Sequence, residues 1–202
     1  MKVSVILAHP QKGSFNSAIA LTTVDQLKRN GHEVRFHDLY EENFDPILKD
    51  TEIPKNANLQ GSVADHCREI AEAEGIVIVH PNWWEQPPAI LKGWIDRVMR
   101  PGVAYEFLDN DTGEGIPNGL LKASVAIVFN TSNTETVREK IIFGDPLGTI
   151  WKNCIFALCG IGTVYRRMFN VIVTSTEEER NIWLDEVRQS VNELFPYYRS
   201  PQ

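Results

Sequence analysis

Residues 76–99 read IVIVHPNWWEQPPAILKGWIDRVM and combine a strand, a loop and a helix in one run. Residues 76–80 are almost wholly apolar, as expected for a short strand that is buried on both faces. Residues 88–99 have a proline near the first turn and an apolar stripe at helical spacing, so they predict a helix. A buried strand that leads directly into an amphipathic helix is typical of a parallel sheet with helices packed on it.

Strand-like and helix-like segments alternate along the rest of the chain. Strands are predicted at residues 3–8, 33–38, 76–80, 124–129 and 170–174, and helices at residues 15–30, 61–73, 88–99 and 147–158. A last helix is predicted from residue 174 or 175, where Ser175 and Glu178 have capping-box spacing. Right-handed crossovers then give a doubly wound, five-stranded parallel α/β sheet covered on both faces. Because no repeat or linker is present, residues 1–202 are expected to form a single domain.

The charge balance and the cysteines limit the class of protein. The formal net charge is -7, which disfavours binding to nucleic acid or to an anionic membrane by charge alone. No apolar run approaches the roughly 20 residues that a membrane span needs, and no charged leader precedes the first strand. The three cysteines lack metal-site spacing, and Cys154 and Cys159 lie in an apolar run typical of a core. We therefore expect a cytoplasmic protein without disulfides.

The five histidines are not paired at metal-ligand spacing. We therefore expect surface or capping roles for them and no metal site. They are His9, His32, His37, His66 and His80.

Parallel sheets of this kind bind ligands beyond the carboxyl ends of their strands. The loop after the first strand, residues 8–16, runs directly into a helix. The free N–H groups and positive end of such a helix suit a phosphate, and His9, Ser14 and Asn16 add side-chain donors. An equally good interpretation is that Ser14 only caps the helix and that His9 is an ordinary loop residue. Neither a GxGxxG nor a Walker motif is present, so neither of those nucleotide sites is indicated.

Two adjacent tryptophans, Trp83 and Trp84, follow the third strand. Aromatic planes and backbone amides at a strand end suit a flat heteroaromatic ring, through stacking and hydrogen bonds to its polar edge. The alternative is that a tryptophan closes the core beneath the next helix. After the fourth strand, residues 130–134 are small and polar. Such residues let backbone amides approach a ring edge, but taken alone they indicate only a polar turn.

These segments carry a resemblance to a known family. Residues 81–98, followed by Gly102-Val103-Ala104-Tyr105, resemble the signature of the NAD(P)H:quinone oxidoreductase family, the flavodoxin-like group that includes DT-diaphorase. His9-Pro10 with Ser14-Phe15-Asn16 resembles the family's flavin phosphate loop, and Leu158-Cys159-Gly160 resembles a segment before its last strand. The resemblance covers residues 3–195 and implies a flavodoxin-like sheet of strand order 2-1-3-4-5.

The resemblance also implies a site. The flavin phosphate and ribityl region is expected to contact His9, Ser14, Phe15 and Asn16. The isoalloxazine ring is expected to lie against Pro81, Asn82, Trp83 and Trp84, with Thr131 and Ser132 at its polar edge. Tyr105 is expected near the cofactor or the dimer interface. The catalytic residues stay unassigned, because hydride transfer is flavin chemistry and the protein supplies placement; Trp83, Trp84 and Tyr105 are candidate pocket residues.

Family members are typically homodimers with the active site between subunits, and NAD(P)H leaves before the acceptor binds. One departure stands out here: the Tyr and His that human-type members carry after the fourth strand correspond to Val137 and Phe143, which leaves the proton donor unassigned. FMN is slightly favoured over FAD, and NADH and NADPH are not distinguished. Quinones, nitroaromatics and azo dyes all fit as acceptors.

Two other functions stay open at this stage. Some relatives are ancillary subunits of potassium efflux systems, and a flavodoxin-like electron carrier would share the fold. A carrier needs no substrate cavity, so the aromatic loop disfavours it.

Overall fold

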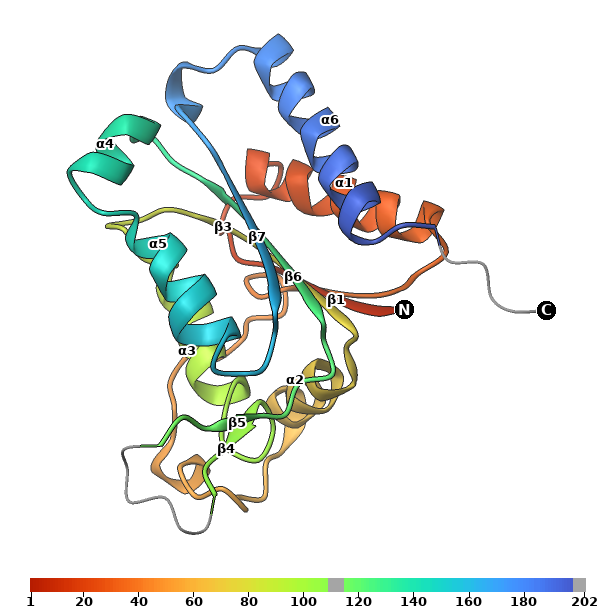
Figure 1. The fold of residues 1–202 in the computed structure, drawn as a ribbon, viewed down its shortest axis with the longest axis vertical. Helices are drawn as coiled ribbons and strands as arrows, with labels where there is room; N and C mark the ends of the chain where they lie inside the picture. Colours follow the sequence, from red (N-terminus) through yellow and green to blue (C-terminus); the bar gives the residue numbers. More distant parts are fainter. Residues whose placement is uncertain (109–114, 198–202) are drawn as a thin grey trace.

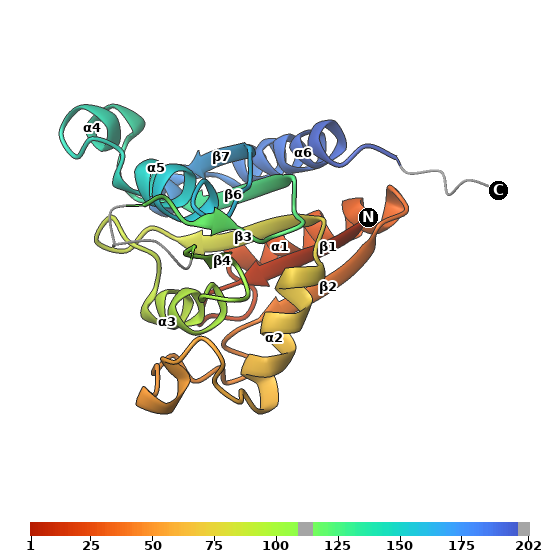
Figure 2. The same cartoon turned by 60° about the horizontal axis from the view of Figure 1, so that its bottom comes forward.

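The computed structural model describes residues 1–108 and 115–197 of the chain. Five parallel strands form the central sheet, in the order β2-β1-β3-β6-β7 (Figure 1 and Figure 2). They are β1 (Lys2–Leu7), β2 (Glu33–Asp38), β3 (Gly75–Pro81), β6 (Val125–Thr131) and β7 (Thr163–Phe169). Numbered among themselves, these strands have the order 2-1-3-4-5, so the predicted flavodoxin-like sheet is confirmed.

Alternate side chains of the strands build two cores, one on each face of the sheet. On one face, Val77 and Ile127 pack under α1 (Phe15–Arg29) and α6 (Glu177–Leu194). On the other, Ile76 and Ala126 pack under α2 (Gly61–Glu72) and α3 (Ala89–Val98), together with residues 147–156 (Figure 1). The strands therefore read as apolar runs, because both of their faces are buried.

The predicted fifth strand at residues 170–174 is wrong. The strand is β7, Thr163–Phe169, and the short 3-10 helix η3 (Ile172–Thr174) follows it. As an edge strand β7 is only partly buried and carries Arg166 and Arg167, so its sequence lacks a continuous apolar run. The apolar residues after it mark the turn into α6, where the N–H of Ile172 donates to the carbonyl of Ser132.

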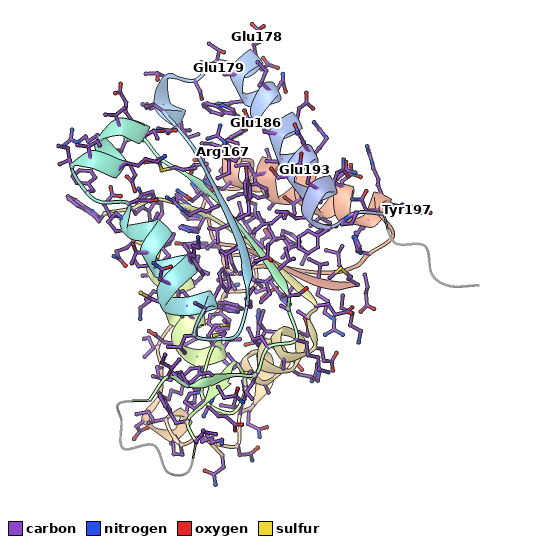
Figure 3. All side chains as sticks on the ribbon, in the orientation of Figure 1. Arg167, Glu178, Glu179, Glu186, Glu193 and Tyr197 are labelled. Carbon is purple, nitrogen blue, oxygen red and sulfur yellow. The ribbon has the colours of Figure 1, made fainter. Side chains whose placement is uncertain are left out.

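The predicted helix at residues 147–158 is a four-residue helix, α5 (Pro146–Thr149), that continues as the π-helical segment η2 (Ile150–Phe156). The capping box of α6 lies one residue later than predicted, on Thr176 and Glu179. Ser175 does not cap the helix because its hydroxyl donates to the carbonyl of Ile172, 2.8 Å away. Arg167 of β7 donates to Glu186 of α6 at 2.9 Å, and both side chains are labelled in Figure 3.

Short elements connect the main ones. A 3-10 helix, η1 (Asp50–Glu52), lies between β2 and α2, and a small antiparallel ribbon joins β4 (Tyr105–Glu106) to β5 (Asn118–Gly119). A Cβ on Gly119 would lie 2.3 Å from the backbone nitrogen of Gly160, so the ribbon needs a glycine where it packs on the Leu158-Cys159-Gly160 turn. The helix α4 (Thr136–Ile141) stands apart from the other helices (Figure 2).

Two predictions about burial need correction. Cys154 is exposed, whereas Cys67 and Cys159 are buried, and all three are free thiols. His32, His66 and His80 are buried rather than at the surface. Among the described helices, none combines the length and the apolarity that a membrane crossing demands.

Candidate functional site

A cavity of about 650 Å³ opens at the carboxyl ends of β1, β3 and β6. Ten of the residues predicted for the flavin site line it, so three separate loops converge as expected from the strand order. Tyr105 does not line it and lies in the β4–β5 ribbon instead. The ten are His9, Ser14, Phe15, Asn16, Pro81, Asn82, Trp83, Trp84, Thr131 and Ser132.

The first loop presents the start of α1 to the cavity. Gly13 has φ +72°, a left-handed conformation that lets the chain turn sharply into the helix. The Ser14 hydroxyl caps α1 by accepting from the N–H of Ser17, 3.2 Å away. Ser14 therefore caps the helix and also lines the cavity, so its two predicted roles coexist. The first-turn N–H groups of Phe15 and Asn16 have no acceptor among the described residues, so this end of the helix suits an anion.

His9 contributes a neutral donor at the same end. Its Nδ1 accepts from the N–H of Gln11, 3.1 Å away, so a neutral ring carries its proton on Nε2. Burial lowers the pKa of His9 below its usual value, against the opposing effects of the Gln11 bond and of Asp38. The ring centroid of His9 lies 6.2 Å from that of Trp83, so the loops after β1 and β3 meet at the cavity.

Asn16 ties α1 to β6 beneath the cavity. Its Nδ2 donates to the hydroxyl of Thr131 over 2.8 Å, and both side chains are buried. The Oδ1 atoms of Asn16 and Asn82 are buried and have no partner among the described residues. Buried amide oxygens without a donor are costly, so each one indicates a ligand group that donates to it.

His80, at the end of β3, holds the next loop in place. The indole Nε1 of Trp151 donates to its Nε2 over 2.9 Å, and its Nδ1 donates to the carbonyl of Pro81 over 2.8 Å. Complete burial lowers the pKa of His80 to about 4, so the ring is neutral at physiological pH. Its position in the apolar run at 76–80 was the signal that could have revealed this buried role.

The two tryptophans are not part of the core. Trp84 is 97% exposed and Trp83 is 43% exposed, so neither closes the space beneath α3. The backbone groups of Trp83 and Gln86 bond reciprocally at 3.1 Å, and Trp84 and Glu85 adopt positive φ in the turn between them. The turn holds both indoles at the cavity, which leaves aromatic faces available to a flat ligand.

Sequence reasoning missed several lining residues. Arg138 and Phe143 come from α4 and the turn after it, and the Arg138 guanidinium lies 5.3 Å from the Phe143 ring centroid. Arg180 of α6 lines the cavity as well, where it lies over the Phe15 ring and donates to the carbonyl of Ile172 at 3.0 Å. Of the two positions where the family's Tyr and His are replaced, Phe143 therefore lines the cavity, whereas Val137 is exposed outside it.

Glu139 is a second omission, and it is buried beside the loop after β3. The Asn82 amide donates to Glu85 at 3.0 Å and to Glu139 at 3.4 Å. Burial, the neighbouring Glu85 carboxyl and the negative charge of Asp145 raise the pKa of Glu139 to about 7, and Arg166 opposes them. No local pattern in the sequence predicted this carboxyl pair, because Glu85 comes from the loop after β3 and Glu139 from α4.

Another cluster lies outside the cavity. His37, Glu42 and His66 place ligand atoms within 4.8 Å of one another. The Trp94 indole N–H donates to Nδ1 of His66 at 3.0 Å, so a neutral His66 carries its proton on Nε2 and directs it to Glu42. A protonated ring nitrogen has no lone pair for a metal. The geometry therefore describes a hydrogen-bond network.

The residues present fit a flavin. A flavin phosphate matches the free N–H groups of α1, and ring or ribityl donors match the unpartnered oxygens of Asn16 and Asn82. The exposed tryptophan faces suit the flat ring.

The fold and the cavity define a flavodoxin-like protein with a ligand site at the carboxyl edge of its sheet. The chain matches the family model for the flavodoxin-like fold, Flavodoxin_2, over residues 1–193, and it belongs to that family. It is 36% identical over 194 residues to a Haemophilus influenzae protein named "Uncharacterized NAD(P)H oxidoreductase", covering 92% of this chain and 91% of that one.

Two further comparisons point to the same group. The chain is 27% identical over 205 residues to the human ribosyldihydronicotinamide dehydrogenase [quinone], covering 89% of this chain and 85% of that one. An NAD(P)H:quinone oxidoreductase structure from Methanothermobacter marburgensis superposes with a TM-score of 0.80 at 25% identity, covering 94% of each chain. The predicted resemblance to the NAD(P)H:quinone oxidoreductase family is therefore confirmed.

Proposed function

We propose that this chain is a flavin-dependent NAD(P)H oxidoreductase that reduces quinones or similar aromatic acceptors by two-electron transfer. The observation that carries the proposal is the convergence of a helix N-terminus, two unpartnered amide oxygens and two exposed tryptophans on one cavity. The names of the relatives support the use of NAD(P)H and of quinones.

In this proposal, the chain's own residues bind the flavin and fix its orientation. The first turn of α1 and His9 hold the phosphate, and Asn16 and Asn82 fix the orientation of the flavin through their Oδ1 atoms. A bound flavin supplies hydride chemistry between NAD(P)H and the acceptor. Donor and acceptor are proposed to use this one cavity in turn, beside the tryptophan turn that lines it.

We propose FMN as the flavin. One phosphate needs one anion site, and the start of α1 supplies it. Arg180, a cation that lines the cavity, already donates to Ser175 and to the carbonyl of Ile172. Mass spectrometry of the cofactor released by heat would identify it, and release of FAD would contradict this part of the proposal.

A homodimer and a cytoplasmic location also belong to the proposal. Apolar side chains gather on α4 and the residue after it, where Val137, Ile141 and Ile142 are 70%, 75% and 69% exposed. These side chains offer an apolar surface on α4 that a second copy would cover. The three free thiols support a reducing compartment.

Reconstitution and steady-state kinetics test the activity. Apoprotein loaded with FMN or FAD is assayed with NADH or NADPH and a soluble quinone, with both concentrations varied. Parallel lines in double-reciprocal plots are expected, because one substrate leaves before the other binds. A loaded protein that shows no NAD(P)H oxidation would contradict the proposal and would favour the electron-carrier function.

A further inference from the structure

Two carboxyl groups lie on either side of the wall of the flavin cavity. Glu85 lines that cavity, whereas Glu139 lines a second cavity of about 630 Å³. The amide of Asn82 lies between the two carboxyls and donates to Glu85 at 3.0 Å and to Glu139 at 3.4 Å. The two carboxyls therefore lie close together around one amide, where two negative charges would repel each other and a single proton relieves that repulsion.

Among the described residues, neither carboxyl forms an ion pair with a cation of its own. Arg166 of β7 is the facing cation, but it forms an ion pair with Asp145 and donates to Asn130 at 2.8 Å. The Oε1 atom of Glu139 is buried and has no partner among the described residues. A buried, unpaired carboxylate is strongly disfavoured, so this environment retains a proton.

The charges around Glu139 come from each element that packs against it. Glu85 faces it from the loop after β3, Asp145 from the turn before α5, and Arg166 from β7. On α4 itself, Arg138 packs over the ring of Phe143 and Lys140 lines the second cavity. The two negative groups outweigh the engaged Arg166, so the balance favours the protonated pair.

We propose that Glu85 and Glu139 hold one proton between them and relay it from the second cavity to the acceptor in the flavin cavity. This inference rests on the proposed function and supplies its missing proton source. NAD(P)H provides a hydride, and a quinone that takes up a hydride needs one proton to become a hydroquinone. That proton leaves the pair for the acceptor oxygen, and water in the second cavity returns one proton to the pair in each turnover.

The pair is tested first without any turnover. In protein carrying ¹³C-labelled glutamate carboxyls, one carbon signal is expected to titrate near pH 7. This signal is expected to be lost in Glu139→Gln and shifted toward ordinary glutamate values in Glu85→Gln. The control is Glu135→Gln, an exposed glutamate just before the same helix, and it leaves the titration unchanged. Titration of all glutamates below about pH 5 would overturn the inference.

The relay is then tested by a pH profile. Quinone reduction at saturating substrate is expected to fall as the pH rises through about 7, because the pair loses its proton. In Glu139→Gln we expect a rate reduced about 10- to 100-fold and without that inflection, since general acid catalysis contributes at least this much. An unchanged profile in Glu139→Gln would overturn the relay. A protein without reductase activity would overturn the proposed function, and the NMR titration would still decide whether the pair shares a proton.

Discussion

The side-chain amide of Asn16 in α1 donates to the hydroxyl of Thr131 at the end of β6, 2.8 Å away. These residues are 115 positions apart in the sequence and meet beneath the cavity. The bond uses the NH₂ group of Asn16, so its Oδ1 has no partner among the described residues. One contact thus fixes both the distance between two loops and the direction of a ligand acceptor.

Asn16→Ala is expected to weaken flavin binding. The variant loses the acceptor and frees the Thr131 hydroxyl, a cost of about 1–3 kcal/mol or roughly 5- to 150-fold in affinity. Quenching of flavin fluorescence by apoprotein measures the change. The control is Asn192→Ala, which removes amide contacts between α6 and α1 outside the cavity. Equal affinity in wild type and Asn16→Ala would remove Asn16 from the site.

Trp83→Ala is expected to weaken flavin retention or slow acceptor reduction. The backbone bonds between Trp83 and Gln86 remain, so the turn keeps its shape while the aromatic face is lost. We expect a loss of about 0.5–1.5 kcal/mol, or roughly 2- to 13-fold. The matched control is Tyr197→Ala, an exposed aromatic at the far end of α6 (Figure 3). Unchanged flavin content together with unchanged turnover would contradict the assignment of Trp83.

His80→Phe is expected to destabilise the fold. It leaves the Trp151 indole N–H and the Pro81 carbonyl without partners, at about 1–3 kcal/mol for each group. The folded protein binds a proton at His80 only near pH 4, whereas the unfolded chain does so below its ordinary pKa of 6.5. Acidification through that interval therefore favours the unfolded state.

Urea unfolding at two pH values measures this linkage. Between pH 7 and pH 5 the wild type is expected to lose about 2 kcal/mol that His80→Phe does not lose. An equal loss in both proteins would show that His80 is not held neutral by the fold.

Glu139 is expected to affect folding stability with a pH dependence opposite to that of His80, and Glu139→Gln tests this. The pKa of Glu139 is raised from 4.5 to about 7, so the folded protein keeps a proton that the unfolded chain releases. The wild type therefore loses stability as the pH rises through this interval, and glutamine avoids the loss. The melting temperature of the variant relative to wild type should be higher at pH 8 than at pH 5. A difference that does not change with pH would contradict a protonated Glu139.

The chain order of the elements predicted the fold because the central strands are buried on both faces and read as apolar runs. It failed at β7, where an edge strand carries Arg166 and Arg167 and its half-exposed face breaks the pattern. The loops that line the cavity were predictable because each is one continuous segment at the end of a predicted strand.

Other parts of the site had no local signature. Glu139 and Arg138 lie on α4, a six-residue helix too short to show a period. Tertiary contacts with the loop after β3 give Glu139 its chemistry. Tyr105, which the resemblance placed near the cofactor or the dimer interface, lies in the β4–β5 ribbon and does not line the cavity, so the interface alternative stays a prediction.

The most direct test is the visible absorbance spectrum of the purified protein, followed by anaerobic addition of NADH or NADPH. We predict the bands of an oxidised flavin, their rapid bleaching by the nicotinamide donor, and their return when a quinone is added. A colourless protein that takes up neither FMN nor FAD, or flavin bands that NADH and NADPH leave unbleached, would contradict the account.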